Sequence, residues 1–226
     1  MLTFLHGFLG SPKDWHPICQ NLSSPCTLLT LPGHQNKPCD LTLLEKEIGP
    51  NTTLIGYSLG GRLAMQFANR YPERIERLIL LSANPGLDKG KHERLKTDAS
   101  WVKLLQTEGM EGFLEKWYQQ PLFSTLDPRL IQHREPHDPQ LLAKVLRHLS
   151  PAKLPSMWNS LQDFSFPVLF LFGERDIKYK PIATRLRKRF PVEFIPNCGH
   201  AIHLENPSLC AQKIQAFIGE PHEQYN

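Results

Sequence analysis

This sequence lacks paired cysteines, long apolar runs and a strong excess of either charge, and each absence argues against a class of protein. The five cysteines are odd in number and lack the paired spacing of zinc sites, so we expect reduced thiols rather than a disulfide framework. No uninterrupted apolar stretch approaches the roughly 20 residues that a membrane-spanning helix needs. Residues 1–10 also lack the form of a secretory signal peptide, and we therefore expect a cytoplasmic protein with no membrane partner.

The charge balance is mildly basic. Lysine and arginine total 26 against 22 acidic residues, and the net charge of +4 is too small to indicate a nucleic-acid partner. It would suit a small anionic substrate if several arginines converged on one site. With 226 residues, of which 40% are hydrophobic, the chain is long enough for one domain with an inserted subdomain. We expect a monomer or a weak homo-oligomer.

Short apolar runs without alternation predict strands that are buried on both faces, which is typical of a parallel sheet. They lie at Leu2–Leu5, Thr27–Leu31, Thr53–Gly56, Arg77–Leu81, Val168–Phe172 and Val192–Ile195. Helices are predicted between them, at Pro12–Leu22, Leu41–Ile48, Leu59–Tyr71, Lys180–Phe190 and Pro207–Ile218. The predicted fold class is therefore α/β.

The alternation of strands and helices stops between Leu81 and Phe166, where about 80 residues of helical character intervene. Trp101, Leu104 and Leu105 share helical spacing, as do Phe113, Leu114 and Trp117. We interpret residues 85–165 as a helical cap inserted into a core made of residues 1–84 and 166–226.

The strongest motif is Gly56-Tyr57-Ser58-Leu59-Gly60, which follows an apolar strand and continues as a helix. Gly-x-Ser-x-Gly in this context is typical of a nucleophile elbow. Asp176 and His200 come later, each just after a predicted strand. The order Ser, acid, His is that of the α/β-hydrolases. We therefore predict an α/β-hydrolase fold with a mostly parallel sheet of about six strands. Because the chain begins at what is usually the third strand of that fold, the first antiparallel strands are expected to be absent.

The motif assigns a role to each of these residues. Ser58 would supply the reactive hydroxyl, His200 would accept its proton, and Asp176 would orient the imidazole. The oxyanion donors would be two backbone N–H groups, that of Leu59 next to the serine and that of Phe8 in the upstream loop His6-Gly7-Phe8-Leu9-Gly10.

Other residues compete for two of these roles. Glu174 and Glu205 are alternatives for the acid, and His203 is an alternative for the histidine. Position favours Asp176, which lies a few residues past a strand end. His200 is favoured because Gly199 leaves the backbone free to aim it.

Two further segments are more specific than the hydrolase motifs, namely Ser58-Leu59-Gly60-Gly61-Arg62 and Trp117-Tyr118-Gln119-Gln120-Pro121. They occur with Asp14-Trp15, Leu31-Pro32-Gly33-His34, Asn84-Pro85-Gly86-Leu87, Gly173-Glu174-Arg175-Asp176 and His203-Leu204-Glu205-Asn206-Pro207. Together they resemble the 2-succinyl-6-hydroxy-2,4-cyclohexadiene-1-carboxylate synthase family of bacterial menaquinone biosynthesis.

The resemblance implies a lyase that eliminates pyruvate from 2-succinyl-5-enolpyruvyl-6-hydroxy-3-cyclohexene-1-carboxylate, with no metal or organic cofactor. Ser58, activated by His200 and Asp176, would then remove a proton instead of attacking a carbonyl. The N–H groups of Phe8 and Leu59 would stabilise the enolate-like charge.

The resemblance also implies how the three carboxylates of the substrate are bound. The family uses arginines, which correspond by motif position to Arg62, Arg94 and Arg134, while Tyr57 and Trp117 line the pocket. From spacing alone, Arg62 lies one helical turn after Ser58 and could reach an anion beside it.

Two other functions remain open at this point. A hydrolase of esters, thioesters or carbon–carbon bonds would use Ser58 as a nucleophile and form an acyl-enzyme. A non-catalytic ligand-binding protein could have kept the fold, although an intact Ser58, Asp176 and His200 set argues against it.

Overall fold

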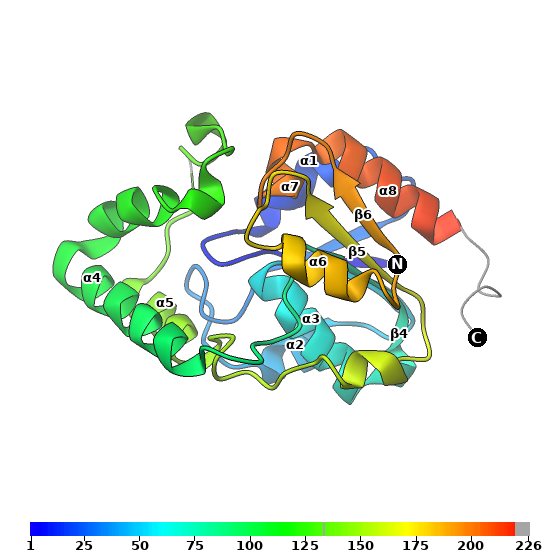
Figure 1. The fold of residues 1–226 in the computed structure, drawn as a ribbon, viewed down its shortest axis with the longest axis horizontal. Helices are drawn as coiled ribbons and strands as arrows, with labels where there is room; N and C mark the ends of the chain where they lie inside the picture. Colours follow the sequence, from blue (N-terminus) through cyan, green and yellow to red (C-terminus); the bar gives the residue numbers. More distant parts are fainter. Residues whose placement is uncertain (133, 220–226) are drawn as a thin grey trace.

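A sheet of six parallel strands forms the centre of the computed structural model, which describes residues 1–132 and 134–219 (Figure 1). Its strands are β1 (Leu2–Leu5), β2 (Cys26–Leu29), β3 (Thr52–Tyr57), β4 (Ile75–Leu81), β5 (Val168–Gly173) and β6 (Val192–Ile195), in the spatial order β2-β1-β3-β4-β5-β6. The predicted α/β class and the parallel sheet are confirmed, and every strand pair in this part of the chain is parallel.

Helices cover both faces of the sheet, which is why its strands are continuous apolar runs. On one face, α1 (His16–Cys19), α7 (Ile202–Glu205) and α8 (Pro207–Gly219) pack on Phe4, Ile79 and their neighbours. On the other, α2 (Thr42–Glu47), α3 (Leu59–Arg70) and α6 (Lys180–Leu186) pack on Leu54, Leu80 and their neighbours. Figure 1 shows α1 and α8 together on one side and α2 and α3 on the other.

Two predicted helices are shorter than expected because of proline. The segment Pro12–Leu22 divides into a 3₁₀ helix, η1 (Pro12–Trp15), and α1, since Pro17 has no N–H to continue the hydrogen-bond ladder. The helix predicted over Lys180–Phe190 ends at Leu186 and is followed by turns at residues 187–189. Pro191 disfavours a helical conformation at Phe190, so the helix does not reach its predicted end. A further 3₁₀ turn, η2 (Pro72–Arg74), precedes β4.

The chain between β4 and β5 is helical, as expected from its sequence. It contains α4 (Lys91–Tyr118), η3 (Pro121–Phe123), η4 (Pro128–Leu130), α5 (Pro139–His148) and η5 (Ser160–Asp163). Helix α4 bends at Gly109, whose φ of 67° and ψ of −166° are not helical. Helices α4 and α5 lie together at one side of the molecule (Figure 1), packed on a shared apolar cluster that includes Leu105, Phe113 and Leu142.

The cap bounds at residues 85 and 165 stay a prediction. Met157, Leu161 and Phe166 pack into the core beside α3 rather than with α4 and α5. Residues 220–226 of the predicted core range lie outside the described residues. Within residues 1–132 and 134–219, the helices are all too short or too polar to cross a membrane.

Candidate active site

Ser58 lies on a sharp turn between β3 and α3, in a backbone conformation that is unusual for a residue with a side chain. Its φ is 49° and its ψ is −105°. The flanking glycines are required by contact: a Cβ on Gly60 would lie 2.3 Å from the carbonyl oxygens of Leu5 and His6, and one on Gly56 would lie 2.6 Å from the Gly60 oxygen. The turn therefore holds Ser58 at the end of the sheet, as a nucleophile elbow does.

The three residues predicted as a triad are joined by hydrogen bonds. His200 Nε2 lies 3.2 Å from Ser58 Oγ, and His200 Nδ1 lies 2.7 Å from Asp176 Oδ2. They come from the loops after β3, β5 and β6, so the chain brings them together at one edge of the sheet. With Nδ1–H donating to the buried Asp176 carboxylate, Nε2 is free to accept the Ser58 hydroxyl proton.

The alternative acids hold the histidine loop instead of contacting the imidazole. Glu205 accepts hydrogen bonds from the N–H groups of Gly199 and Ala201, at 2.8 and 3.1 Å. Glu174 accepts one from the Asn197 N–H at 3.2 Å. His203 is 1% exposed, and its ring nitrogens have no hydrogen-bond partner within the described residues. The hydrogen bonds thus favour Asp176 and His200 over their rivals.

The loop predicted to supply an oxyanion donor runs beside Ser58. A Cβ built on Gly7 would lie 3.7 Å from the Ser58 Cβ. The Phe8 N–H donates to no backbone carbonyl of residues 1–132 or 134–219, and Leu59 begins α3, where N–H groups have no intrahelical acceptor. Both N–H groups are therefore available next to the hydroxyl, and their role as oxyanion donors stays a prediction.

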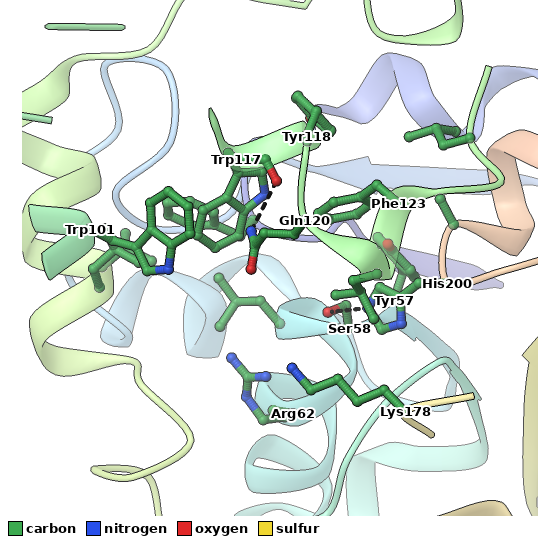
Figure 2. A pocket seen from close by; sticks show the side chains of 18 of the residues that line it. Tyr57, Ser58, Arg62, Trp101, Trp117, Tyr118, Gln120, Phe123, Lys178 and His200 are labelled. Atoms are coloured by element: carbon green, nitrogen blue, oxygen red, sulfur yellow. Dashed lines mark hydrogen bonds between the residues drawn. The ribbon is translucent and has the colours of Figure 1, made fainter. Parts of the chain in front are cut away.

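A cavity of about 230 Å³ opens above Ser58. The residues predicted to bind substrate all line it, namely Tyr57, Arg62, Arg94, Trp117 and Arg134. Figure 2 shows the indole rings of Trp101 and Trp117 on one side of this pocket and the cationic ends of Arg62 and Lys178 on another. The Trp101 and Trp117 ring centroids are 5.0 Å apart, and that of Phe8 lies 4.8 Å from Trp117. The pocket therefore combines an aromatic wall with several cations.

The three predicted arginines differ in charge compensation. Arg94 Nε is 2.8 Å from Asp98 Oδ1, and Arg134 Nη1 is 2.5 Å from Asp14 Oδ1. Arg62 has no carboxylate within 4.0 Å in the part of the chain that the structure describes, and its Nη2 donates only a 3.5 Å hydrogen bond to a backbone carbonyl. Burial lowers the pKa of Arg62 from the usual arginine value to about 10. Among the three arginines, Arg62 is therefore the one whose positive charge is least compensated by carboxylates of the described residues.

Known proteins match the chain over most of its length. The α/β hydrolase family matches residues 4–213. The 2-succinyl-6-hydroxy-2,4-cyclohexadiene-1-carboxylate synthase of Enterobacter sp. (strain 638) is 33% identical over 229 residues, which cover 93% of this chain and 88% of that protein. The chain belongs to the 2-succinyl-6-hydroxy-2,4-cyclohexadiene-1-carboxylate synthase family.

Two further matches extend this family assignment. The solved structure of MenH from S. aureus has a TM-score of 0.88 and 30% sequence identity, and the match covers 96% of this chain and 92% of that one. Protein PHYLLO, chloroplastic, of Arabidopsis thaliana is 31% identical over 261 residues and matches 97% of this chain, but the chain spans only 15% of that protein's length. The family resemblance and the α/β-hydrolase fold are confirmed.

The pocket also holds charged residues to which the sequence assigned no role in binding. Asp98 follows Arg94 by four residues on α4, a spacing that could have revealed the pair. Asp14 lies 120 residues from Arg134 and gave no such signal. Lys178 lines the pocket two residues after Asp176. Burial, and then the charge of Arg94, lower the pKa of Lys178.

A column of three histidines beneath the oxyanion loop was also missed. The ring centroids of His6 and His34 are 4.9 Å apart, and those of His34 and His137 are 5.5 Å apart. His6 Nδ1 donates to the Gly7 carbonyl at 2.8 Å, and its Nε2 accepts from the Leu31 N–H at 3.0 Å. Burial lowers the pKa of all three, that of His6 to about 3. This histidine column is therefore neutral and fixes the oxyanion loop to the loop after β2.

Proposed function

We propose that this protein is a carbon–oxygen lyase of menaquinone biosynthesis, a 2-succinyl-6-hydroxy-2,4-cyclohexadiene-1-carboxylate synthase. It eliminates pyruvate from 2-succinyl-5-enolpyruvyl-6-hydroxy-3-cyclohexene-1-carboxylate. The observation that carries this proposal is the hydrogen-bonded chain from Asp176 through His200 to Ser58, which ends in a pocket lined by arginines. Membership of the synthase family supports the same reaction.

The proposed reaction begins with proton transfer. His200 Nε2 takes the hydroxyl proton of Ser58, and the serine oxygen removes the proton from ring carbon 2, next to the succinyl carbonyl. The ring double bond shifts, the carbon–oxygen bond at ring carbon 5 breaks, and the enolate of pyruvate leaves and takes up a proton. Asp176 stabilises the imidazolium that forms on His200.

Charge develops on the succinyl carbonyl oxygen during this step. The backbone N–H groups of Phe8 and Leu59 are the proposed donors to that oxygen, and the N-terminus of α3 favours negative charge there. Donors fixed by the fold need no reorganisation as the charge appears, which makes this stabilisation effective.

The substrate carries three carboxylates, which explains the cations of the pocket. We assign Arg62, Arg94 and Arg134 to carboxylate binding, with Tyr57 and Trp117 in contact with the apolar part of the substrate. Arg62 supports this assignment most directly, because its Nε is buried and the side chain has no carboxylate of its own among the described residues.

The proposed setting is the cytoplasm, and the proposed state is a monomer or a weak homo-oligomer. Five free cysteines, two of them buried, support a reducing compartment.

The test is pyruvate release from the enolpyruvyl substrate, followed through coupled NADH oxidation by lactate dehydrogenase, with Ser58→Ala as the inactive control. We expect turnover without an initial burst, because the lyase forms no acyl-enzyme. Absence of pyruvate release, together with burst kinetics on simple esters, would assign the site to a hydrolase instead.

A further inference from the structure

Asp14 joins two segments that border the pocket. It lies in η1, directly after the oxyanion loop, and it lines the pocket together with Arg134. Its Oδ1 accepts from Arg134 Nη1 at 2.5 Å, while its Oδ2 accepts from the Ser11 N–H at 3.3 Å. One carboxylate thus contacts both the arginine between η4 and α5 and the end of the loop that carries Phe8.

The pair is shielded from solvent. The Arg134 side chain is 12% exposed and that of Asp14 is 11% exposed. Asp14 is the only carboxylate within 4.0 Å of the Arg134 side chain in residues 1–132 and 134–219. Other titratable groups also face the guanidinium. They are Tyr118 on α4, which is hydrogen-bonded to Arg134, Tyr57 at the end of β3, and the buried histidines His6, His137 and His203. Without Asp14, the arginine would be a largely buried cation with no counter-ion.

Arg134 nevertheless keeps donors for a ligand. Its Nε has no hydrogen-bond partner in the described chain, and Asp14 binds through Nη1. A guanidinium has five N–H donors in a fixed plane, so an anchor on one side determines where the remaining donors point.

The loop on the other side of Asp14 is short and rigid. The Gly10 N–H donates to the Gly7 carbonyl at 3.1 Å, and the Asp14 N–H donates to the Ser11 carbonyl at 3.1 Å. Phe8 lies within this closed turn, so the loop cannot shift relative to Asp14 without breaking these bonds.

We propose that Asp14 is a positioning residue that couples the substrate carboxylate at Arg134 to the oxyanion donor at Phe8. The proposal rests on the proposed function. It assigns Asp14 no contact with the reacting atoms: its carboxylate orients the guanidinium on one side and fixes the oxyanion loop on the other. If the salt bridge served stability alone, its loss would lower the melting temperature without a coupled change in KM and kcat.

The test is a double-mutant cycle with Asp14→Asn and Arg134→Ala, measured by pyruvate release. We expect Asp14→Asn to raise KM and lower kcat, with a roughly 10- to 100-fold fall in kcat/KM, because both the arginine and the loop lose their anchor. In the Arg134→Ala background, the effect of Asp14→Asn on KM should disappear, while its effect on kcat should remain. Equal effects on KM in both backgrounds would overturn the proposal.

A matched control is an Asp–Arg pair in the segment that also carries Arg134. Asp127 pairs with Arg129 in η4, where both side chains are exposed, and neither residue lines the pocket. Asp127→Asn should therefore keep wild-type kcat and KM. Kinetics for Asp14→Asn equal to those of this control would also overturn the proposal.

A second variant guards against loss of folding. Asp14→Glu keeps the charge but moves it by one methylene, so a melting temperature near that of the wild type with a lowered kcat supports a positioning role. Wild-type kinetics in Asp14→Glu would contradict it. Failure of the proposed function itself is distinct, because then the unmodified protein releases no pyruvate.

Discussion

Replacement of Arg62 by methionine should make the free protein more stable while making the enzyme worse. Arg62 is a partly buried cation that has a buried Nε and no carboxylate within 4.0 Å among the described residues, and burial lowers its pKa from the usual arginine value to about 10. At 1.36 kcal/mol for each pH unit, this fall corresponds to roughly 3 kcal/mol of unfavourable burial free energy at pH 7. Methionine fills a similar volume without charge. The free energy of unfolding should therefore rise by up to about 3 kcal/mol.

For a chain of this length, 1 kcal/mol corresponds to about 2–4 °C, so Tm should rise by several degrees in the absence of substrate. The activity should move the other way. A substrate carboxylate left without its charged partner costs on the order of 2 to 5 kcal/mol, which is a fall of about 30-fold to several thousand-fold in kcat/KM. Arg62→Lys should recover only part of this loss, because a point charge does not reproduce a planar fork.

The assays are thermal unfolding by circular dichroism at pH 7 and pyruvate release. Arg70→Met on the same helix is the control, since Arg70 is 68% exposed and pairs with Glu45. It should leave kcat/KM unchanged and should not raise Tm. A lower Tm for Arg62→Met with full activity would refute the reasoning, because Arg62 would then be neither strained by burial nor used for binding.

Three other outcomes follow from the geometry. The kcat should fall by a similar factor, on the order of a thousandfold or more, in Ser58→Ala, in His200→Ala and in the double variant, because the two residues act as one unit. Additive losses in the double variant would count against the triad. Lowering the pH from 7 to 5 should lower the free energy of unfolding, because histidine protonates near pH 6.5 in the unfolded chain, whereas His6 has a pKa of about 3 in the folded protein. The expected loss is about 2 kcal/mol for each histidine of the column whose pKa lies well below 5. Urea unfolding midpoints measure this loss, and a midpoint that does not change with pH would contradict it. Gly60→Ala should lower Tm sharply because its Cβ would meet two carbonyl oxygens at 2.3 Å. Gly219→Ala is the matched control, because its Cβ would meet no atom within 4 Å outside its own helix in residues 1–132 and 134–219, and equal Tm values for the two variants would exclude the contact argument.

The sheet could be predicted from the sequence because buried parallel strands leave a local signal. Runs such as Leu54–Gly56 and Val168–Phe172 are apolar along their whole length, and the polar and small residues that follow them mark the edge where ligands bind. The elbow could also be predicted, since Gly-x-Ser-x-Gly between a strand and a helix is a local pattern, although the contacts of Gly60 with the Leu5 and His6 carbonyl oxygens appear only in the fold.

The remaining features depend on contacts between distant parts of the chain. The pairing of Asp14 with Arg134 and the edge-to-face contact of His34 with His137 join segments about a hundred residues apart. No spacing rule predicts such contacts. The bend of α4 at Gly109 was missed because an isolated glycine inside a helical pattern is compatible with an unbroken helix.

The cations of the pocket belong to different parts of the fold. Arg62 is four residues from Ser58 on α3, so about 6 Å of helix fixes the distance between the two residues along the helix axis. Arg94 and Arg134 are carried by the chain between β4 and β5. A ligand with carboxylates at both ends therefore cross-links this chain to α3, and its binding free energy adds to the stability with which α4 and α5 stay in place. Affinity and the order of that helical segment are thus linked equilibria: whatever loosens α4 weakens binding, even when every residue that touches the ligand is unchanged.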